Sequence, residues 1–129
     1  MSAPLPIPQF KSRHFKQTDP FDRPWHVEFR WLQTGISIRH ADTVDVKFAL
    51  HTEGEVQEKV IALPHPLLLA LASRSGHELT DAWCFRLAAS HLRGMIQSWA
   101  DMDKVLVTLT ASELDAATQH VKRMEAQLA

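Results

Sequence analysis

The chain between residues 25 and 63 alternates between apolar and polar positions, with a period of two. Trp25, Val27, Phe29 and Trp31 fall on one face of this pattern. Such alternation is typical of strands that bury one face. Short polar turns separate the apolar stretches, two of them with a glycine that can adopt a positive φ. The pattern predicts an antiparallel meander of about four strands, at residues 25–31, 36–39, 44–50 and 55–63.

Helical signals follow the predicted sheet. Pro66 suits the first turn of a helix that ends before Gly76, and Thr80 can cap a longer helix that extends to about residue 99. Residues 105–109 form a short apolar run, after which Thr110 and Glu113 match a capping box. The expected fold is therefore α+β, with two to three helices on one face of the meander and a short extra strand before the C-terminal helix.

The first 24 residues differ from the remainder because they hold five of the seven prolines. Proline fixes φ and removes a hydrogen-bond donor, so we expect residues 1–24 to form an extended arm. Residues 25–129 would then form a single α+β domain.

The long helix predicted after Thr80 carries a narrow polar stripe of Arg86, Ser90, Arg93 and Gln97. So narrow a stripe indicates that the helix is mostly buried, in its own domain or against a second copy. Gly94 lies inside this helix, where it implies a close neighbour or a bend.

Trp83 and Trp99 lie at either end of the same helix, and large aromatic rings are favoured anchors of interfaces. These rings, together with Arg86 and Arg93, form the predicted interaction site. The expected partner is a second copy of the chain, in a homodimer, or another protein.

Composition narrows the classes of function. The chain has 129 residues and a net charge of -1, whereas dedicated nucleic-acid binders carry a clear basic excess. Its longest apolar run, Leu67 to Ala72, is far shorter than the ~20 residues of a membrane span. We therefore expect neither nucleic acid nor membrane as a partner. The single cysteine and the lack of a signal-peptide pattern place the protein in a bacterial cytoplasm.

Eight histidines are the most unusual feature of the composition. His40, His51 and His91 are the candidate ligand-binding residues, because strand-end and helical histidines can converge in a fold. No recognised metal-ligand spacing links them, so no metal site and no cofactor is predicted.

The sequence also shows no recognised set of catalytic residues. Cys84 is a possible nucleophile, but His91 is about 10 Å further along the helix, and Asp81 opposes thiolate formation. Paired acids such as Asp101 and Asp103 fall in predicted turns, where aspartate bonds its own backbone. No catalytic residue is assigned.

These observations lead to two hypotheses. The first is a non-catalytic accessory or interaction protein that self-associates. The alternative is a small-ligand or metal-binding domain that uses histidines between sheet and helices.

Overall fold

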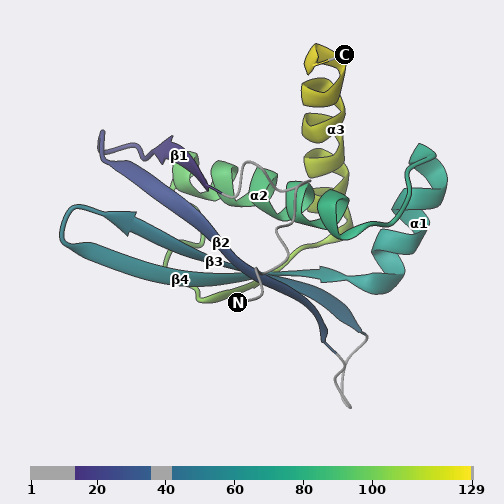
Figure 1. Cartoon of the computed structure of the whole chain (residues 1–129), viewed down its shortest axis with the longest axis horizontal. Coiled ribbons are helices and arrows are strands. Elements are labelled where there is room, and N and C mark those ends of the chain that lie inside the picture. Colours follow the sequence, from purple (N-terminus) through teal and green to yellow (C-terminus); the bar gives the residue numbers. More distant parts are fainter. Residues whose placement is uncertain (1–13, 36–41, 129) are drawn as a thin grey trace, which may run out of the picture.

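The computed structural model describes residues 14–35 and 42–128, which form one five-stranded sheet with three helices (Figure 1). The predicted α+β class is confirmed. All three helices lie on the same side of the sheet. Within the described ranges, no helix is both long and apolar enough to cross a membrane.

The strands follow one another across the sheet in chain order. They are β1 (His14–Thr18), β2 (Pro24–Gly35), β3 (Thr43–Thr52), β4 (Glu55–Pro64) and β5 (Leu106–Thr108). The first four are antiparallel, and β5 joins β4 in parallel. The meander and the short extra strand are confirmed, but the first strand comes from the predicted arm. The strand predicted at residues 36–39 lies outside the described residues.

Asp19 explains how β1 is held beside β2. Its buried carboxylate accepts hydrogen bonds from the backbone N–H of Phe21 and Arg23, from the Arg23 guanidinium and from the Trp25 indole, at 2.8–3.0 Å. Burial alone would raise the pKa of Asp19, but these hydrogen bonds lower it to about 2. The turn between β1 and β2 is thereby fixed, and the strand His14–Thr18 pairs with β2 in the sheet.

A β-bulge in β2 places Trp31 on the opposite face of the sheet from the one predicted. The register between β2 and β3 shifts between Phe29 and Trp31, because Arg30 has no partner in the ladder. The extra residue moves Trp31 to the face opposite Phe29. Trp31 pairs there with Lys47 and is 37% exposed, instead of packing under the helices with Trp25.

Helix boundaries follow the predicted caps. α1 (His65–Ser75) has Pro66 in its first turn and ends at Gly76, whose φ is 67°. α2 (Asp81–Ser98) begins after Thr80, whose hydroxyl accepts the N–H of Trp83. α3 (Ala111–Leu128) begins after Thr110, which exchanges both capping-box hydrogen bonds with Glu113.

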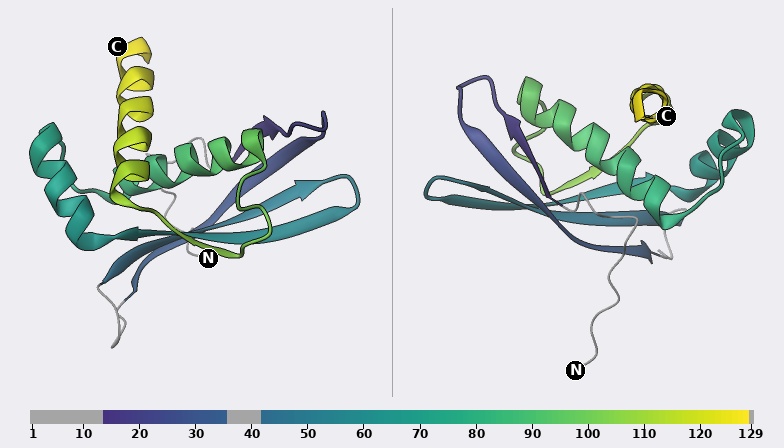
Figure 2. Two further views of the ribbon diagram at one scale, coloured as in Figure 1. Left: turned by 180° about the vertical axis from the view of Figure 1, so that it is seen from behind. Right: turned by 45° about the horizontal axis from the view of Figure 1, so that its top comes forward.

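α2 lies against the sheet and forms the centre of the core. Most of its circumference is buried, by the inner residues of β1 to β4 on one side and by α3 on the other. α3 packs on the outer side of α2 and extends away from the sheet, while α1 lies at one end (Figures 1 and 2). The opposite face of the sheet is covered by no helix of the described chain.

Candidate functional site

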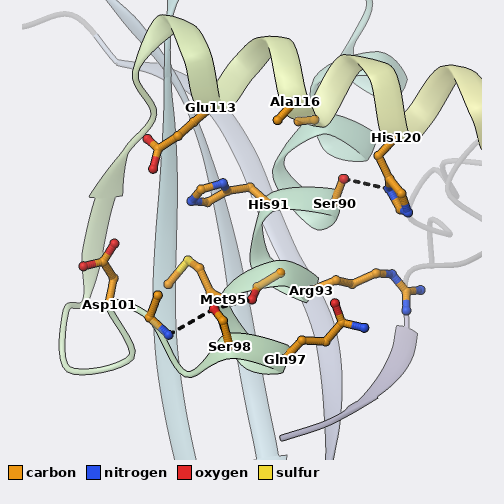
Figure 3. Close-up of a pocket in the computed structure, with 13 residues that line it drawn as sticks. Ser90, His91, Arg93, Met95, Gln97, Ser98, Asp101, Glu113, Ala116 and His120 are labelled. Atoms are coloured by element: carbon orange, nitrogen blue, oxygen red, sulfur yellow. Dashed lines mark hydrogen bonds between the residues drawn. The ribbon is translucent and has the colours of Figure 1, made fainter. Parts of the chain in front are cut away.

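A pocket of about 420 Å³ lies between the C-terminal half of α2 and the N-terminal half of α3. Its volume falls within the range of about 300–1,000 Å³ that is usual for small-molecule sites. Gly94, Ala116 and Ala117 contribute small residues to its lining. Polar side chains surround them (Figure 3), namely Ser90, His91, Arg93, Gln97, Ser98, Asp101, Glu113 and His120.

The loop after α2 carries Asp101 to the pocket. Trp99 and Asp101 have φ values of 62° and 57°, in the left-handed region that costs about 1–2 kcal/mol for residues other than glycine. The ring of Trp99 offsets this cost by packing on Phe21 and Trp25, with centroids 5.6 and 6.0 Å apart. The sharp turn of the chain is therefore held by the same cluster that fixes the β1–β2 turn.

A buried lysine fixes the other end of this loop. Lys59 points from β4 into the core, where it is 2% exposed. Its ammonium group donates hydrogen bonds to the backbone carbonyls of Met102 and Lys104. A buried ammonium that lost these acceptors would be strongly destabilised, so the bonds hold the loop to the sheet. Asp101 thus sits on a rigid wall of the pocket.

His91, Asp101 and Glu113 lie at the same end of the pocket (Figure 3). The Nε2 atom of His91 is buried, and no group in the described part of the chain forms a hydrogen bond with it. Burial lowers the pKa of His91 from its ordinary value of 6.5, and the charges of Glu113 and Asp101 oppose that shift. His91 is therefore neutral near neutral pH.

Each of the two carboxylates is only partly engaged. Glu113 Oε1 accepts the N–H of Thr110 at 2.9 Å, and Asp101 Oδ1 lies 3.3 Å from the ammonium of Lys104. A carboxylate offers about four lone-pair sites, so both residues retain free acceptor positions.

The opposite side of the pocket carries His120, Arg93 and Gln97 (Figure 3). His120 Nδ1 forms a 2.8 Å hydrogen bond with the hydroxyl of Ser90. The Arg93 guanidinium stacks on the ring of Phe15, 4.0 Å from its centroid, so it also joins α2 to β1.

Gly94 lies at the centre of the α2 stripe that lines the pocket. A Cβ placed at this position would meet no atom within 4 Å. The expectation that a close neighbour requires this glycine is therefore wrong. Ser90, His91, Gln97 and Ser98, one turn away on either side, all line the pocket, so a side chain at position 94 would project into it.

The structure separates the predicted ligand-binding histidines. His91 lines the pocket, whereas His51 lies on the uncovered face of the sheet, where its Nε2 is 3.6 Å from Glu28. His40 lies outside the described residues. His51 and His91 do not converge, and the pocket lies between two helices rather than between sheet and helices.

The predicted interaction residues contact their own chain. Trp83 is 1% exposed and stacks on His77, so its side chain presents no surface to a partner. Trp99 is half-buried against the β1–β2 turn. Arg86 forms a 2.7 Å ion pair with Glu125 of α3. Of the two alternatives for the buried surface of α2, its own domain or a second copy, the apolar residues of α2 are buried within the chain itself.

Cys84 is a buried residue of the core. Burial, and to a smaller extent the charge of Asp81, raises the pKa of its thiol to about 12. The thiol is therefore protonated at neutral pH, which disfavours the role of nucleophile.

No group of three histidine, cysteine, aspartate or glutamate side chains in the described ranges is arranged to hold a metal ion. The metal-binding form of the alternative hypothesis thus receives no support from these residues.

Sequence reasoning missed His120, Asp101 and Glu113 as site residues. Glu113 and Asp101 were assigned to a cap and a turn, and they occupy both positions while also lining the pocket. The available signal was the helical spacing of residues 113, 116, 117 and 120, which places them on one side of α3. Nothing in that spacing showed that this side faces Gly94.

Comparison of the chain with protein-family models, curated proteins and solved structures finds no match. The function is therefore argued from the geometry of the pocket.

We predict that acid destabilises the protein partly through His91. Because its pKa in the folded chain lies below 6.5, the unfolded chain binds a proton at a higher pH than the folded chain. The free energy of unfolding should fall as the pH is lowered from above 6.5 toward the pKa of folded His91.

Urea unfolding at a series of pH values measures this effect, with stability at pH 8 as the baseline. The decline should be smaller in His91→Asn than in the wild type. An NMR titration in which the His91 imidazole has its midpoint at or above 6.5 would refute the assignment.

Proposed function

We propose that the protein binds a small polar molecule in the pocket between α2 and α3. The observation that carries this proposal is the pocket of about 420 Å³ itself, which polar side chains of both helices line. Ligand sites are concave and carry a small number of polar groups that orient the bound molecule.

Gly94 supports the same proposal independently. A glycine inside a helix costs about 1 kcal/mol relative to alanine, and here no neighbour requires it. Its lack of a side chain keeps the pocket open. Destabilisation that serves no packing purpose is typical of functional sites.

The rigid surroundings of the pocket provide a third argument. Binding sites that are formed before the ligand arrives avoid the entropic cost of ordering side chains on binding. Lys59 and Trp99 hold the loop that carries Asp101, and the capping box holds Glu113.

The proposal is tested by placing a larger side chain at Gly94, where it would occupy the pocket. Gly94→Leu should fold, because leucine is a good helix former and its side chain has open space. Gly94→Ala is the matched control, and it should raise the free energy of unfolding by up to about 1 kcal/mol.

Binding is measured by ¹H–¹⁵N NMR with a library of small cationic, anionic and neutral polar molecules. At least one compound should shift the signals of residues that line the pocket, in a saturable manner. Gly94→Ala should bind it within a few-fold of the wild type, and Gly94→Leu should not bind it. A library without any such compound, or equal binding by Gly94→Leu, would contradict the proposal.

Self-association is a second candidate function, and one observation favours it. β5 is an edge strand, and Val105 and Leu106 beside its edge are 65% and 58% exposed. Exposed apolar residues at a free edge favour pairing with another strand. Two copies joined through β5 would form one continuous sheet.

Sedimentation velocity at micromolar concentration distinguishes this candidate. The wild type should be a dimer and Leu106→Lys a monomer, because a lysine at the edge opposes strand pairing. A monomeric wild type would remove the candidate without affecting the pocket.

A reducing compartment, such as the cytoplasm of a bacterium, remains a proposal for the location of the protein. The unpaired thiol of Cys84 supports it.

A further inference from the structure

We propose that the molecule bound in the α2–α3 pocket carries an oxyanion group, a carboxylate or a phosphate, which is held by the guanidinium of Arg93. This inference rests on the proposed function and specifies the chemistry of the ligand. It follows from the place of Arg93 in the lining of the pocket and from its contacts with the rest of the chain.

Arg93 differs from the two other half-buried arginines of the described ranges in its electrostatic partners. Arg23 forms ion pairs with two carboxylates. Arg86, two turns before Arg93 on the same stripe of α2, pairs with Glu125 at 2.7 Å. No described carboxylate forms an ion pair with Arg93.

The remaining parts of the sequence provide no acidic side chain either. Residues 1–13, 36–41 and 129 include neither aspartate nor glutamate, so all 15 acidic residues lie in the described ranges. Burial disfavours the charged form of a side chain, and it lowers the pKa of Arg93 from its ordinary value. A bound anion would supply the opposite charge that the chain does not place beside this guanidinium.

The contacts of Arg93 within the chain position its guanidinium and leave most of its donors free. The group lies over the ring of Phe15, 4.0 Å from the centroid, and its Nη1 donates a long hydrogen bond of 3.5 Å to the carbonyl of Lys16. A guanidinium has five N–H donors along its edge, in a fork that fits two oxygens of a carboxylate or phosphate. Stacking on an aromatic ring uses the face of the group, so the edge stays available for such an oxyanion.

Two further polar side chains, Gln97 and His120, line the same side of the pocket as Arg93 (Figure 3). Gln97 lies one turn after Arg93 on α2, and its amide has two donors. His120 forms its 2.8 Å hydrogen bond with Ser90 through Nδ1. In the tautomer in which Nδ1 is the acceptor, Nε2 carries the proton and is a third kind of donor. This side of the pocket can therefore surround an oxyanion with donors.

The two carboxylates of the pocket have partners of their own. Asp101 lies 3.3 Å from the ammonium of Lys104, and Glu113 accepts the N–H of Thr110 in the capping box. Both lie on the side of the pocket opposite Arg93 (Figure 3). An oxyanion held by Arg93 would therefore be placed away from them.

The charge is removed by Arg93→Gln. Arg123→Gln is the matched control, because it removes the same charge from an exposed residue of α3 that does not line the pocket.

A second variant leaves the contact between Arg93 and Phe15 in place. Gln97→Glu adds a carboxylate four residues after Arg93, where oppositely charged side chains on a helix pair. The chain itself would then neutralise the guanidinium. Gln119→Glu is the control for this variant, because it adds the same charge at an exposed position of α3 outside the pocket.

The experiment titrates the ¹⁵N-labelled full chain at pH 7.5 and low ionic strength, in a buffer without chloride. The probes are glycolate and inorganic phosphate as anions, ethylene glycol as a neutral molecule and ethanolamine as a cation. At least one of the two anions should shift the side-chain Nε–H signal of Arg93 and the amide signals of Gln97 and His120 in a saturable manner. Ethylene glycol and ethanolamine should not. The anion that binds more tightly identifies the group as a carboxylate or a phosphate.

The variants should separate in their affinity for that anion. Arg93→Gln and Gln97→Glu should bind it at least about tenfold more weakly than the wild type, because charge-assisted hydrogen bonds to an oxyanion are among the strongest in proteins. Both controls should bind it within twofold of the wild type.

Failure of this inference is distinguishable from failure of the proposed function. If ethylene glycol, ethanolamine or a library compound without an anionic group shifts the pocket signals and neither anion does, the pocket binds ligands and the oxyanion assignment is overturned. Wild-type affinity of Gln97→Glu for the anion also overturns it, whether or not Arg93→Gln folds. If no probe and no library compound shifts the pocket signals, both proposals fail.

Discussion

The packing of α2 against the sheet is the interaction on which the rest of the structure depends. Its inner side meets the apolar residues of four strands, and each large side chain fully buried there stabilises the fold by about 1.5–3 kcal/mol. α3 is attached to the sheet mainly through α2, and the loop that follows α2 closes back on the β1–β2 turn. Because α2 is fixed along its length, the residues on its outer stripe form a rigid surface.

The two ends of that outer stripe differ in how they meet α3. Arg86, at its N-terminal end, is joined to α3 by the ion pair with Glu125, and α3 closes on α2 there. Toward its C-terminal end the stripe carries Gly94, and a space remains between the helices. A polar cavity over a helical glycine that no neighbour requires is not needed for stability. We therefore connect it with binding.

Much of the fold could be predicted from the sequence, because its signals are local. The capping box at Thr110 and the cap at Thr80 need only the residues of one helical turn, and both are confirmed. β1 was missed because the prolines on either side of it led us to expect an extended arm over residues 1–24, although His14–Thr18 itself contains no proline. Its pairing depends on Asp19, whose four hydrogen bonds cannot be foreseen from spacing. A single bulge residue, Arg30, reversed the expected orientation of Trp31.

The site could be predicted only in part, because it is formed by residues distant in the sequence. His91 was a candidate on account of its residue type, but its neighbours Asp101 and Glu113 already had a complete local explanation. Only the crossing of α2 and α3 places them together. The surface expected to bind a partner, around Trp83, is covered by the chain's own His77 and core.

The central claim is that the space over Gly94 is a ligand site rather than a packing defect. A crystal structure of the protein with the tightest-binding compound of the library tests it most directly. We expect the compound to lie over Gly94, between α2 and α3. A compound bound on the uncovered face of the sheet, with the space over Gly94 empty, would contradict this claim.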